Sequence, residues 1–340
     1  MISVAYFVLI VQVGLRWETG TDWHPYLEHF ESIKGYNTTS PFLTGFEYGY
    51  NLFVWIVKFI SKDYSFFLLL HAIIYYFLIV KSFRRYTPYL YLTLMIFYAS
   101  TMGIMGSNRQ LIALAICLYA LRYIIEEKPA MFFMFIAIAI SFHTTAFLFL
   151  IYYFLNREIK PVVLIVIIGS SYIIGKTQLP ILLFSLFGNA IGGATATKTL
   201  IYLAKAENSL SEYQLSIFGL IKRLLFISVF YYNRKKIGEI LPFYNLMLNG
   251  YIIGIAFYFL FIDSLLVMVS RGSIFFNVME ALLVSAQLFL FNRKENKVVA
   301  ITFLLILSFF YFYQSIVTYP DLFLPYKGIF INTDIHRLRI

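Results

Sequence analysis

The polar residues that follow the first apolar stretch are the first candidates for chemistry. After ISVAYFVLIVQVGL the chain reads RWETGTDWHPYLEHF over residues 16–30. Asp22, Tyr26 and Phe30 recur at i, i+4 and i+8, so a short helix would place them on one side. A carboxylate beside aromatic rings resembles a sugar site, whereas the alternative is a plain amphipathic helix at the headgroup level. The candidate site residues of this stretch are Arg16, Asp22, His24 and Tyr26.

A second candidate is Arg109, in the stretch GSNRQLIALAICLYALRYI. Ser107 and Asn108 are good helix N-caps, so Arg109 and Gln110 are expected in the first turn of a long apolar helix. The free N–H groups of that turn and a guanidinium together make a strong oxyanion site. We therefore predict that Arg109 binds phosphate; the alternative is an interfacial arginine that snorkels to water.

Other ionisable residues lie inside apolar segments, where charges are costly and usually face a cavity. His143, in AIAISFHTTAFLF, is a candidate general base or phosphate donor, or else a hydrogen-bonding partner of a neighbouring helix. Lys222 and Arg223, in FGLIKRLLF, and Arg271, in VSRGS, are candidate substrate ligands with a snorkelling role as the alternative. Glu280 is expected to pair with another charge in the core.

The composition identifies the kind of protein in which these residues stand. Of 340 residues, 61% are hydrophobic and only 13% are charged, and the mean hydropathy is +0.78. A soluble domain is about half apolar and a quarter charged. The chain is therefore predicted to be a polytopic helical membrane protein. Its net charge of +10 is then an orientation signal, and no nucleic-acid partner is expected.

Apolar segments recur along the whole chain and give the expected architecture. We predict one all-α integral-membrane domain over 1–340, a bundle of about 9–11 transmembrane or re-entrant helices. The apolar segments lie at 1–15, 46–61, 64–83, 88–106, 108–125, 129–155, 161–179, 215–232, 239–262, 265–291 and 297–317.

Five basic clusters between these segments predict the orientation, because Lys and Arg favour cytoplasmic loops. They are Lys81–Arg85, Arg122–Lys128, Arg157–Lys160, Arg234–Lys236 and Arg293–Lys297. This places an external loop with a short helix at 16–45 and a large external loop at 180–214. Strict alternation of the spans fails at two places, so we expect that 46–61 only dips into the outer leaflet and that 129–155 consists of two helical halves that meet near His143. The alternative is that the positive-inside rule fails locally.

Several signatures of other enzyme classes are missing from the sequence. A GxxxxGK[ST] phosphate-binding loop does not occur, which argues against ATP-driven transport. Neither HExxH nor a Cys/His cluster suggests zinc. No Asp-x-Asp pair stands in an expected external loop, which argues against a metal-dependent sugar transferase. We therefore expect no metal and no cofactor.

Four motifs in the same order and spacing resemble the EpsG family, which are Wzy-like exopolysaccharide and O-antigen polymerases of bacterial inner membranes. The resemblance is good over residues 1–160 and rests on hydropathy beyond them. The motifs are Arg16–Gly20-Thr21-Asp22–Tyr26–Phe30, Glu47-Tyr48-Gly49-Tyr50, Asn108-Arg109-Gln110–Ala113 and Phe142-His143-Thr144.

The resemblance implies a metal-independent glycosyltransferase that uses undecaprenyl-pyrophosphate-linked oligosaccharides. Such an enzyme transfers the growing glycan to the non-reducing end of a lipid-linked repeat unit on the periplasmic or external side of the inner membrane. A chain-length regulator protein and membrane lipids are the further partners it implies. The alternatives are an O-antigen ligase and a non-enzymatic flippase or exporter of lipid-linked sugars.

Residue roles follow from that chemistry. Arg109 would stabilise the leaving pyrophosphate, assisted by Arg271 and Arg16, and Asp22 or His143 would be the base. The candidate catalytic residues are Asp22, Arg109 and His143. The candidate substrate-binding residues are Arg16, His24, Tyr26, Glu47, Gln110, Lys222, Arg223 and Arg271.

Overall fold

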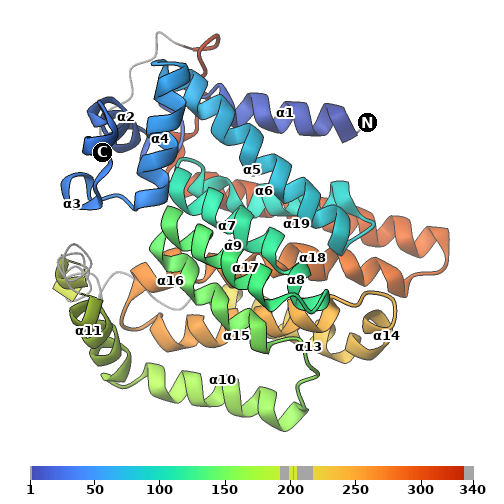
Figure 1. Ribbon diagram of the computed structural model, residues 1–340. Coiled ribbons are helices and arrows are strands. Elements are labelled where there is room, and N and C mark those ends of the chain that lie inside the picture. The colour runs from blue at the N-terminus through green and yellow to red at the C-terminus, as the bar shows by residue number, and fades with distance from the viewer. Residues whose placement is uncertain (1, 192–198, 202, 205–216, 333–340) are drawn as a thin grey trace. The chain divides into compact units, whose positions relative to one another are not determined.

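The protein is built from helices (Figure 1). The computed structural model describes residues 2–191, 199–201, 203–204 and 217–332, and these contain isolated β-bridges but no strand. The described chain forms two compact units, residues 1–150 with 284–340, and residues 151–283.

The helices of the first unit include those of the predicted apolar segments, with similar bounds, and, among the described residues, four short ones outside these segments. They are α1 (Ile2–Gly14), α2 (Trp23–Ser32), η1 (Tyr36–Thr39), α3 (Pro41–Thr44), α4 (Tyr48–Ile60), α5 (Tyr64–Tyr86), α6 (Leu90–Thr101), η2 (Met102–Ile104), α7 (Asn108–Ala120), α8 (Arg122–Ile125), α9 (Pro129–Phe142), η4 (Gln287–Leu290), α19 (Lys294–Val317) and η5 (Pro320–Leu322). The second unit contains α10 (Pro161–Gly175), α11 (Leu179–Ile191), α13 (Ile217–Tyr232), α14 (Arg234–Gly238), α15 (Tyr244–Phe261), α16 (Leu266–Gly272) and α17 (Ile274–Asn277). The helices η3 (Thr144–Phe154) and α18 (Met279–Ala286) each contain residues of both units.

Five stretches of helix are long and apolar enough to cross a membrane. In the described part of the chain these are Tyr64–Tyr86, Asn108–Ile125, Tyr244–Phe261, Met268–Leu290 and Lys294–Val317. Helices α10 and α11 pass the same test together but are bent by 85°. Four shorter apolar helices accompany them. The chain is therefore a multi-pass membrane protein, and the predicted all-α class is confirmed.

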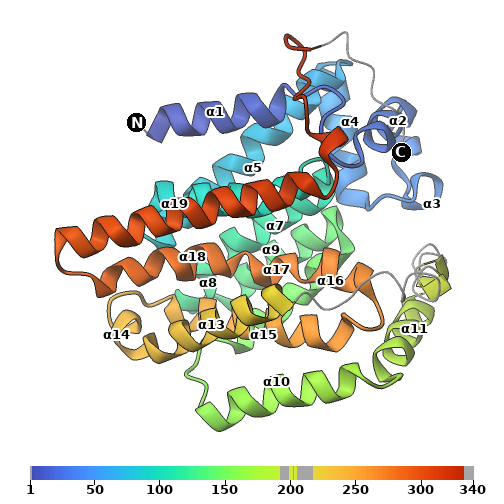
Figure 2. The same ribbon diagram turned by 180° about the vertical axis from the view of Figure 1, so that it is seen from behind.

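Helix α7 is the central element of the first unit. It packs against α5 and α9, while α1 packs on α5 and α19 on α6 (Figures 1 and 2). Side chains all around α7 are buried, as expected of a helix that is apolar on every face. The polar residues at its N-terminus are thus mounted on a rigid element.

The apolar segment 129–155 is broken where the sequence predicted. Helix α9 ends at Phe142, His143 has an extended backbone, and the chain continues as the 3₁₀ helix η3. The break lies against the start of α4, where a Cβ at Gly49 would overlap the side chain of Ser141. Glycine at this position lets the Glu47 region and the His143 region approach each other closely.

The two predicted external loops have different outcomes. The loop 16–45 contains the predicted short helix, α2, which follows Asp22 and carries Pro25 in its first turn. The loop 180–214 begins as helix instead, because the apolar run LPILLFSLF continues α11 to Ile191. Most of the remainder of that loop lies outside the described residues.

The segment before α2 packs directly on the loop before α7. The Thr21 N–H donates to the Met105 carbonyl at 3.0 Å, and Gly20 and Gly106 both have positive φ angles, of 94° and 123°. A Cβ on Gly106 would overlap the carbonyl group of Thr21. This glycine therefore permits the contact that brings the Asp22 loop to the N-terminus of α7.

Replacing Gly106 by Ala should separate these two loops and destabilise the protein by at least about 2 kcal/mol, because both the φ angle and the overlap oppose a side chain. The melting temperature of the purified protein measures this. Gly169→Ala is the matched control, since nothing surrounds a Cβ at that helical position, and it should raise stability slightly. Equal melting temperatures for the two variants would contradict the packing described here.

Candidate active site

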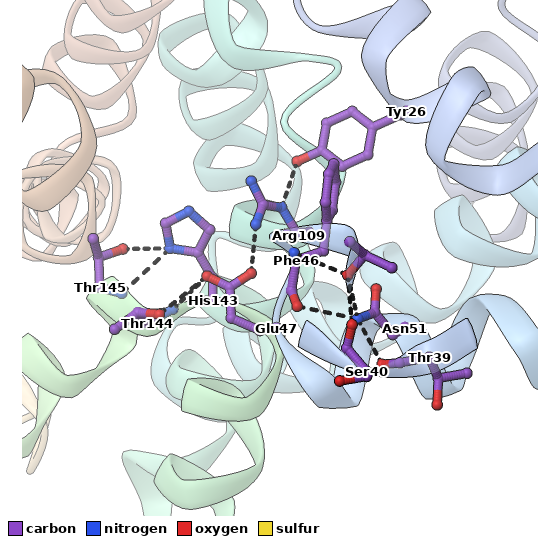
Figure 3. Close-up of polar contacts among 11 residues, drawn as sticks. Tyr26, Thr39, Ser40, Phe46, Glu47, Asn51, Arg109, His143, Thr144 and Thr145 are labelled. Carbon is purple, nitrogen blue, oxygen red and sulfur yellow. Dashed lines mark hydrogen bonds and ion pairs between the residues drawn. The ribbon is translucent and has the colours of Figure 1, made fainter. Parts of the chain in front are cut away.

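Arg109 lies at the centre of a polar cluster at the N-terminus of α7 (Figure 3). Its Nη1 donates to Glu47 Oε2 at 2.5 Å, and its Nε donates to the Tyr26 hydroxyl at 3.1 Å. The guanidinium also lies 4.2 Å from the ring centroid of Phe46, a cation–π distance. Two segments far from Arg109 in the sequence, around Tyr26 and around Glu47, thus fix one cation.

Glu47 is the counter-ion, and both of its oxygens are engaged. While Oε2 accepts from Arg109, Oε1 accepts from the Thr144 N–H at 3.2 Å and from the Thr144 hydroxyl at 3.1 Å. Burial alone would raise the pKa of Glu47, but the Arg109 guanidinium, His143 and the Thr144 N–H outweigh it and hold the pKa below its ordinary value of 4.5. A carboxylate stabilised in this way is a poor proton acceptor and a good positioning group.

The arginine keeps donors beyond those used by Glu47 and Tyr26. Among the described residues Nη2 of Arg109 has no hydrogen-bond partner, and the side chain is 13% exposed. The ion pair orients the guanidinium without exhausting its five N–H groups. The free side of the fork can therefore receive an oxyanion.

His143 lies beside this ion pair and is 7% exposed. The Thr145 N–H points to His143 Nδ1 at 3.3 Å, and the Thr145 hydroxyl lies 2.6 Å from the same nitrogen. An Nδ1 that accepts the Thr145 amide proton leaves the proton of a neutral ring on Nε2. This arrangement favours His143 as a hydrogen-bond donor to an anion over a role as base.

Asp22 lies beside the N-terminus of α7. Its Oδ2 accepts from the Ser107 hydroxyl at 3.4 Å, its side chain is exposed, and it precedes Tyr26 by one helical turn. An accessible carboxylate within one turn of the arginine's partner is placed to accept a proton. His24, also predicted, packs edge-on against Trp23, and among the described residues no contact joins it to Arg109 or Glu47.

Comparison with known proteins identifies the family of the chain that carries this site. The family model described as the EpsG family matches residues 1–328. The chain belongs to the EpsG family. Membership indicates a polysaccharide-polymerase type of function and a glycosyltransferase-like enzyme. Neither the curated proteins nor the solved structures contain a significant match to this chain.

Arg16, another predicted substrate ligand of this EpsG chain, contacts α1 and the first residue of α7 rather than Arg109 or Glu47. It is 1% exposed and donates to the Val13 carbonyl at 2.5 Å and to Asn108 Oδ1 at 2.7 Å. The Asn108 carbonyl in turn accepts a hydrogen bond from His71 Nε2 at 2.8 Å. Arg16 therefore positions the first residue of α7, and Gln110 is likewise buried in that turn.

The remaining predicted ligands belong to the second unit, which is described by itself. Lys222 on α13 pairs with Glu280 at 2.9 Å, and Tyr251 donates to the same carboxylate at 3.0 Å, so Glu280 does pair with another charge. Arg223 donates to the Gly219 carbonyl and lies 3.9 Å from the ring centroid of Tyr258. These contacts give Lys222 and Arg223 protein partners.

Arg271 is exposed on α16 of that unit. Its role as a substrate ligand stays a prediction.

Two contributors to the EpsG site were not singled out as ligands from the sequence. Phe46 covers one face of the guanidinium, and Thr144 binds Glu47 through both its N–H and its hydroxyl. Each stands directly beside a predicted residue, Glu47 or His143. Their position next to a candidate residue was the one sequence feature that could have identified them. Phe and Thr are too common in an apolar chain for that position alone to mark a site residue.

The Arg109–Glu47 pair should make stability depend on pH. Because the pKa of Glu47 is lowered in the folded protein, the ionised carboxylate stabilises the folded state. This contribution is complete above about pH 5 and is lost as the pH falls through the lowered pKa. Glu47→Gln should cost about 3 kcal/mol at pH 7, since it leaves a buried guanidinium without its counter-ion. The difference in melting temperature from the native protein should shrink below pH 4.5.

Glu126→Gln is the matched control, because Glu126 pairs with Arg85 and Lys128 at the surface, where ion pairs contribute little. A Glu47→Gln penalty that is absent at pH 7, or unchanged at pH 3, would show that the pair is not the stabilising contact.

Proposed function

We propose that this protein polymerises a polysaccharide by transferring the growing glycan from undecaprenyl pyrophosphate to the non-reducing end of a lipid-linked repeat unit. The observation that supports it most is the partly exposed Arg109 fork, fixed at a helix N-terminus between Glu47 and Tyr26. A diphosphate is the leaving group that such a fork fits, because a guanidinium binds phosphate oxygens bidentately.

The reaction breaks one bond and forms one. A hydroxyl of the acceptor sugar attacks the anomeric carbon of the donor, and the bond from that carbon to the pyrophosphate oxygen breaks with its electron pair on oxygen. Charge develops on the diphosphate, where the Nη2 donors of Arg109 and the N–H groups at the start of α7 stabilise it. His143 can add an Nε2–H donor from the side of Glu47.

The proton of the acceptor hydroxyl goes to Asp22 in this proposal. Its carboxylate is exposed, and among the described residues its one side-chain hydrogen bond is the long contact with Ser107, whereas Glu47 has both oxygens occupied. Tyr26 is one helical turn after Asp22, the proposed base, and its hydroxyl accepts a hydrogen bond from Arg109, the proposed diphosphate ligand. Glu47, Tyr26 and Phe46 act as positioning residues that hold the guanidinium in one orientation.

We further propose that this site opens to the external side of the cytoplasmic membrane of a bacterium. The basic clusters of the loops support that orientation, since they favour the cytoplasm. Lipid-linked repeat units and a chain-length regulator protein are the partners that fit such an enzyme.

Arg109→Lys should lower polymer formation at least about 100-fold, because an ammonium cannot bind the diphosphate bidentately. The glycan profile of a deletion strain that carries the variant measures this, and single repeat units should accumulate on the lipid at the external face. Arg85→Lys, a change in an exposed ion pair, should restore normal polymer.

Normal polymer with Arg109→Lys would remove this residue from the mechanism. Repeat units trapped on the cytoplasmic side would indicate a flippase, and full-length polymer that remains on its lipid without reaching its final acceptor would indicate a ligase.

The orientation has its own test. A cysteine at the exposed position Glu28 should react with a membrane-impermeant maleimide in intact cells, and one at the exposed position Arg84 should react only after permeabilisation. The native chain is the control, because its single cysteine, Cys117, is buried. The reverse pattern would place the Arg109 cluster on the cytoplasmic side and exclude the proposed reaction.

A further inference from the structure

A groove of about 870 Å³ lies apart from the Arg109 cluster, at the other end of α4. Helix α2, the last turns of α4 and the start of α5 form its walls, and α2 and α4 lie side by side in Figure 1. Five of the residues that line it carry aromatic rings. Those used below are Trp17, Phe30, Trp55, Phe59 and Tyr64.

An aromatic stripe on α4 connects the groove with the Arg109 cluster. Tyr48, Trp55 and Phe59 recur at i, i+7 and i+11, so they share one side of the helix. Tyr48 directly follows Glu47 and is 44% exposed, and Phe59 at the groove is 87% exposed. Between them Tyr36 stacks edge-on with Trp55 at 5.6 Å and its hydroxyl lies 2.9 Å from that of Tyr48.

The distance from the Arg109 cluster to the groove is shorter than an oligosaccharide of several sugars. The carboxylate of Glu47 marks one end of α4 and Lys58 marks the groove. Eleven residues of helix separate them, which is roughly 16 Å at 1.5 Å per residue. A chain of several sugars that starts at the Arg109 cluster can therefore reach the groove along the stripe.

The groove carries side chains of both charges. Lys58 donates to the Phe30 and Glu31 carbonyls at 2.7 and 3.3 Å, which holds α2 against α4. The exposed side chains of Glu31, Lys34 and Lys62 stand at its rim. Carboxylates accept hydrogen bonds from hydroxyls and ammonium groups donate to ring and hydroxyl oxygens. Because the lining combines the carboxylates of Glu31 and Asp63 with three lysines, it suits a polyhydroxylated chain.

We infer that this groove and the stripe of Tyr48, Trp55 and Phe59 hold the growing glycan between transfers. This inference rests on the proposed polymerase function. Partly exposed Trp17 and Trp55 offer flat apolar faces on which pyranose rings stack, and Glu31, Lys34 and Lys62 bind their hydroxyls. A glycan held here stays near the Arg109 cluster after each transfer, so the next transfer occurs at a high effective concentration. The groove thereby sets chain length.

Chain length is the first readout. In a deletion strain, Trp55→Ala should weaken glycan retention about fivefold, the effect of one lost aromatic contact, and shift the polymer ladder to shorter chains. Trp55→Phe keeps a ring and should restore much of the length. Phe309→Ala is the matched control, since Phe309 is 72% exposed on α19, away from the groove, and should give the normal ladder.

A Trp55→Ala ladder with normal modal length would overturn the inference and leave the polymerase proposal intact. An equal loss of all lengths, not restored by Trp55→Phe, would also overturn it, because that pattern indicates a structural role only.

Binding is the second readout and needs no catalysis. The chain has three tryptophans, so the Trp17→Phe, Trp23→Phe variant reports on Trp55 alone. In nanodiscs, oligosaccharides released by mild acid from the host's lipid-linked glycan should change this fluorescence saturably, also when Arg109→Lys is added. Brominated phosphatidylglycerol in the nanodisc distinguishes the rival occupant. Quenching of Trp55 by the brominated lipid that the oligosaccharide does not relieve would show a lipid site and overturn the inference.

Discussion

The site depends on one largely buried ion pair. Arg109 and Glu47 are 13% and 18% exposed, so little water solvates either charge, and each needs the other. The pair joins the start of α7 to the start of α4, and its two further partners, Tyr26 and Thr144, join α2 and η3 to the same point. A single guanidinium thus determines how four segments meet, and a charge held this firmly is already oriented before a substrate arrives.

The surroundings of the pair are arranged to keep it in place. Helix α7 is buried on every face, so its first turn cannot shift without disturbing α5 and α9. Arg16 fixes Asn108 from below, and the close contact of Thr21 with Met105 and Gly106 brings the Asp22 loop alongside. These contacts explain why the first unit combines long apolar helices with a dense polar segment just after α1.

Much of this could be predicted from the sequence. The bounds of the apolar segments are close to those of the long helices. The start of α7 at Asn108 was predicted from the residues that favour a helix N-terminus, and the break at His143 was predicted from the positions of the basic clusters. The function of individual charges could not be predicted in the same way. Arg16 and Arg109 both follow or precede apolar segments, and the sequence does not distinguish their roles. Their burial and partners, which are tertiary properties, do: Arg16 is buried and binds Asn108, whereas Arg109 binds Glu47 and keeps Nη2 available. Likewise the sequence could not show which charge pairs with Glu280, because its partner Lys222 stands 58 residues away in the chain.

The central claim is that the free side of the Arg109 guanidinium receives a diphosphate lipid. A cryo-electron microscopy map of the purified protein in nanodiscs that contain undecaprenyl pyrophosphate tests it most directly. Density for the diphosphate should lie at hydrogen-bonding distance, about 3 Å, from Nη2 of Arg109, with the Arg109–Glu47 pair intact. Diphosphate density bound elsewhere, with Arg109 contacting only Glu47 and Tyr26, would contradict it.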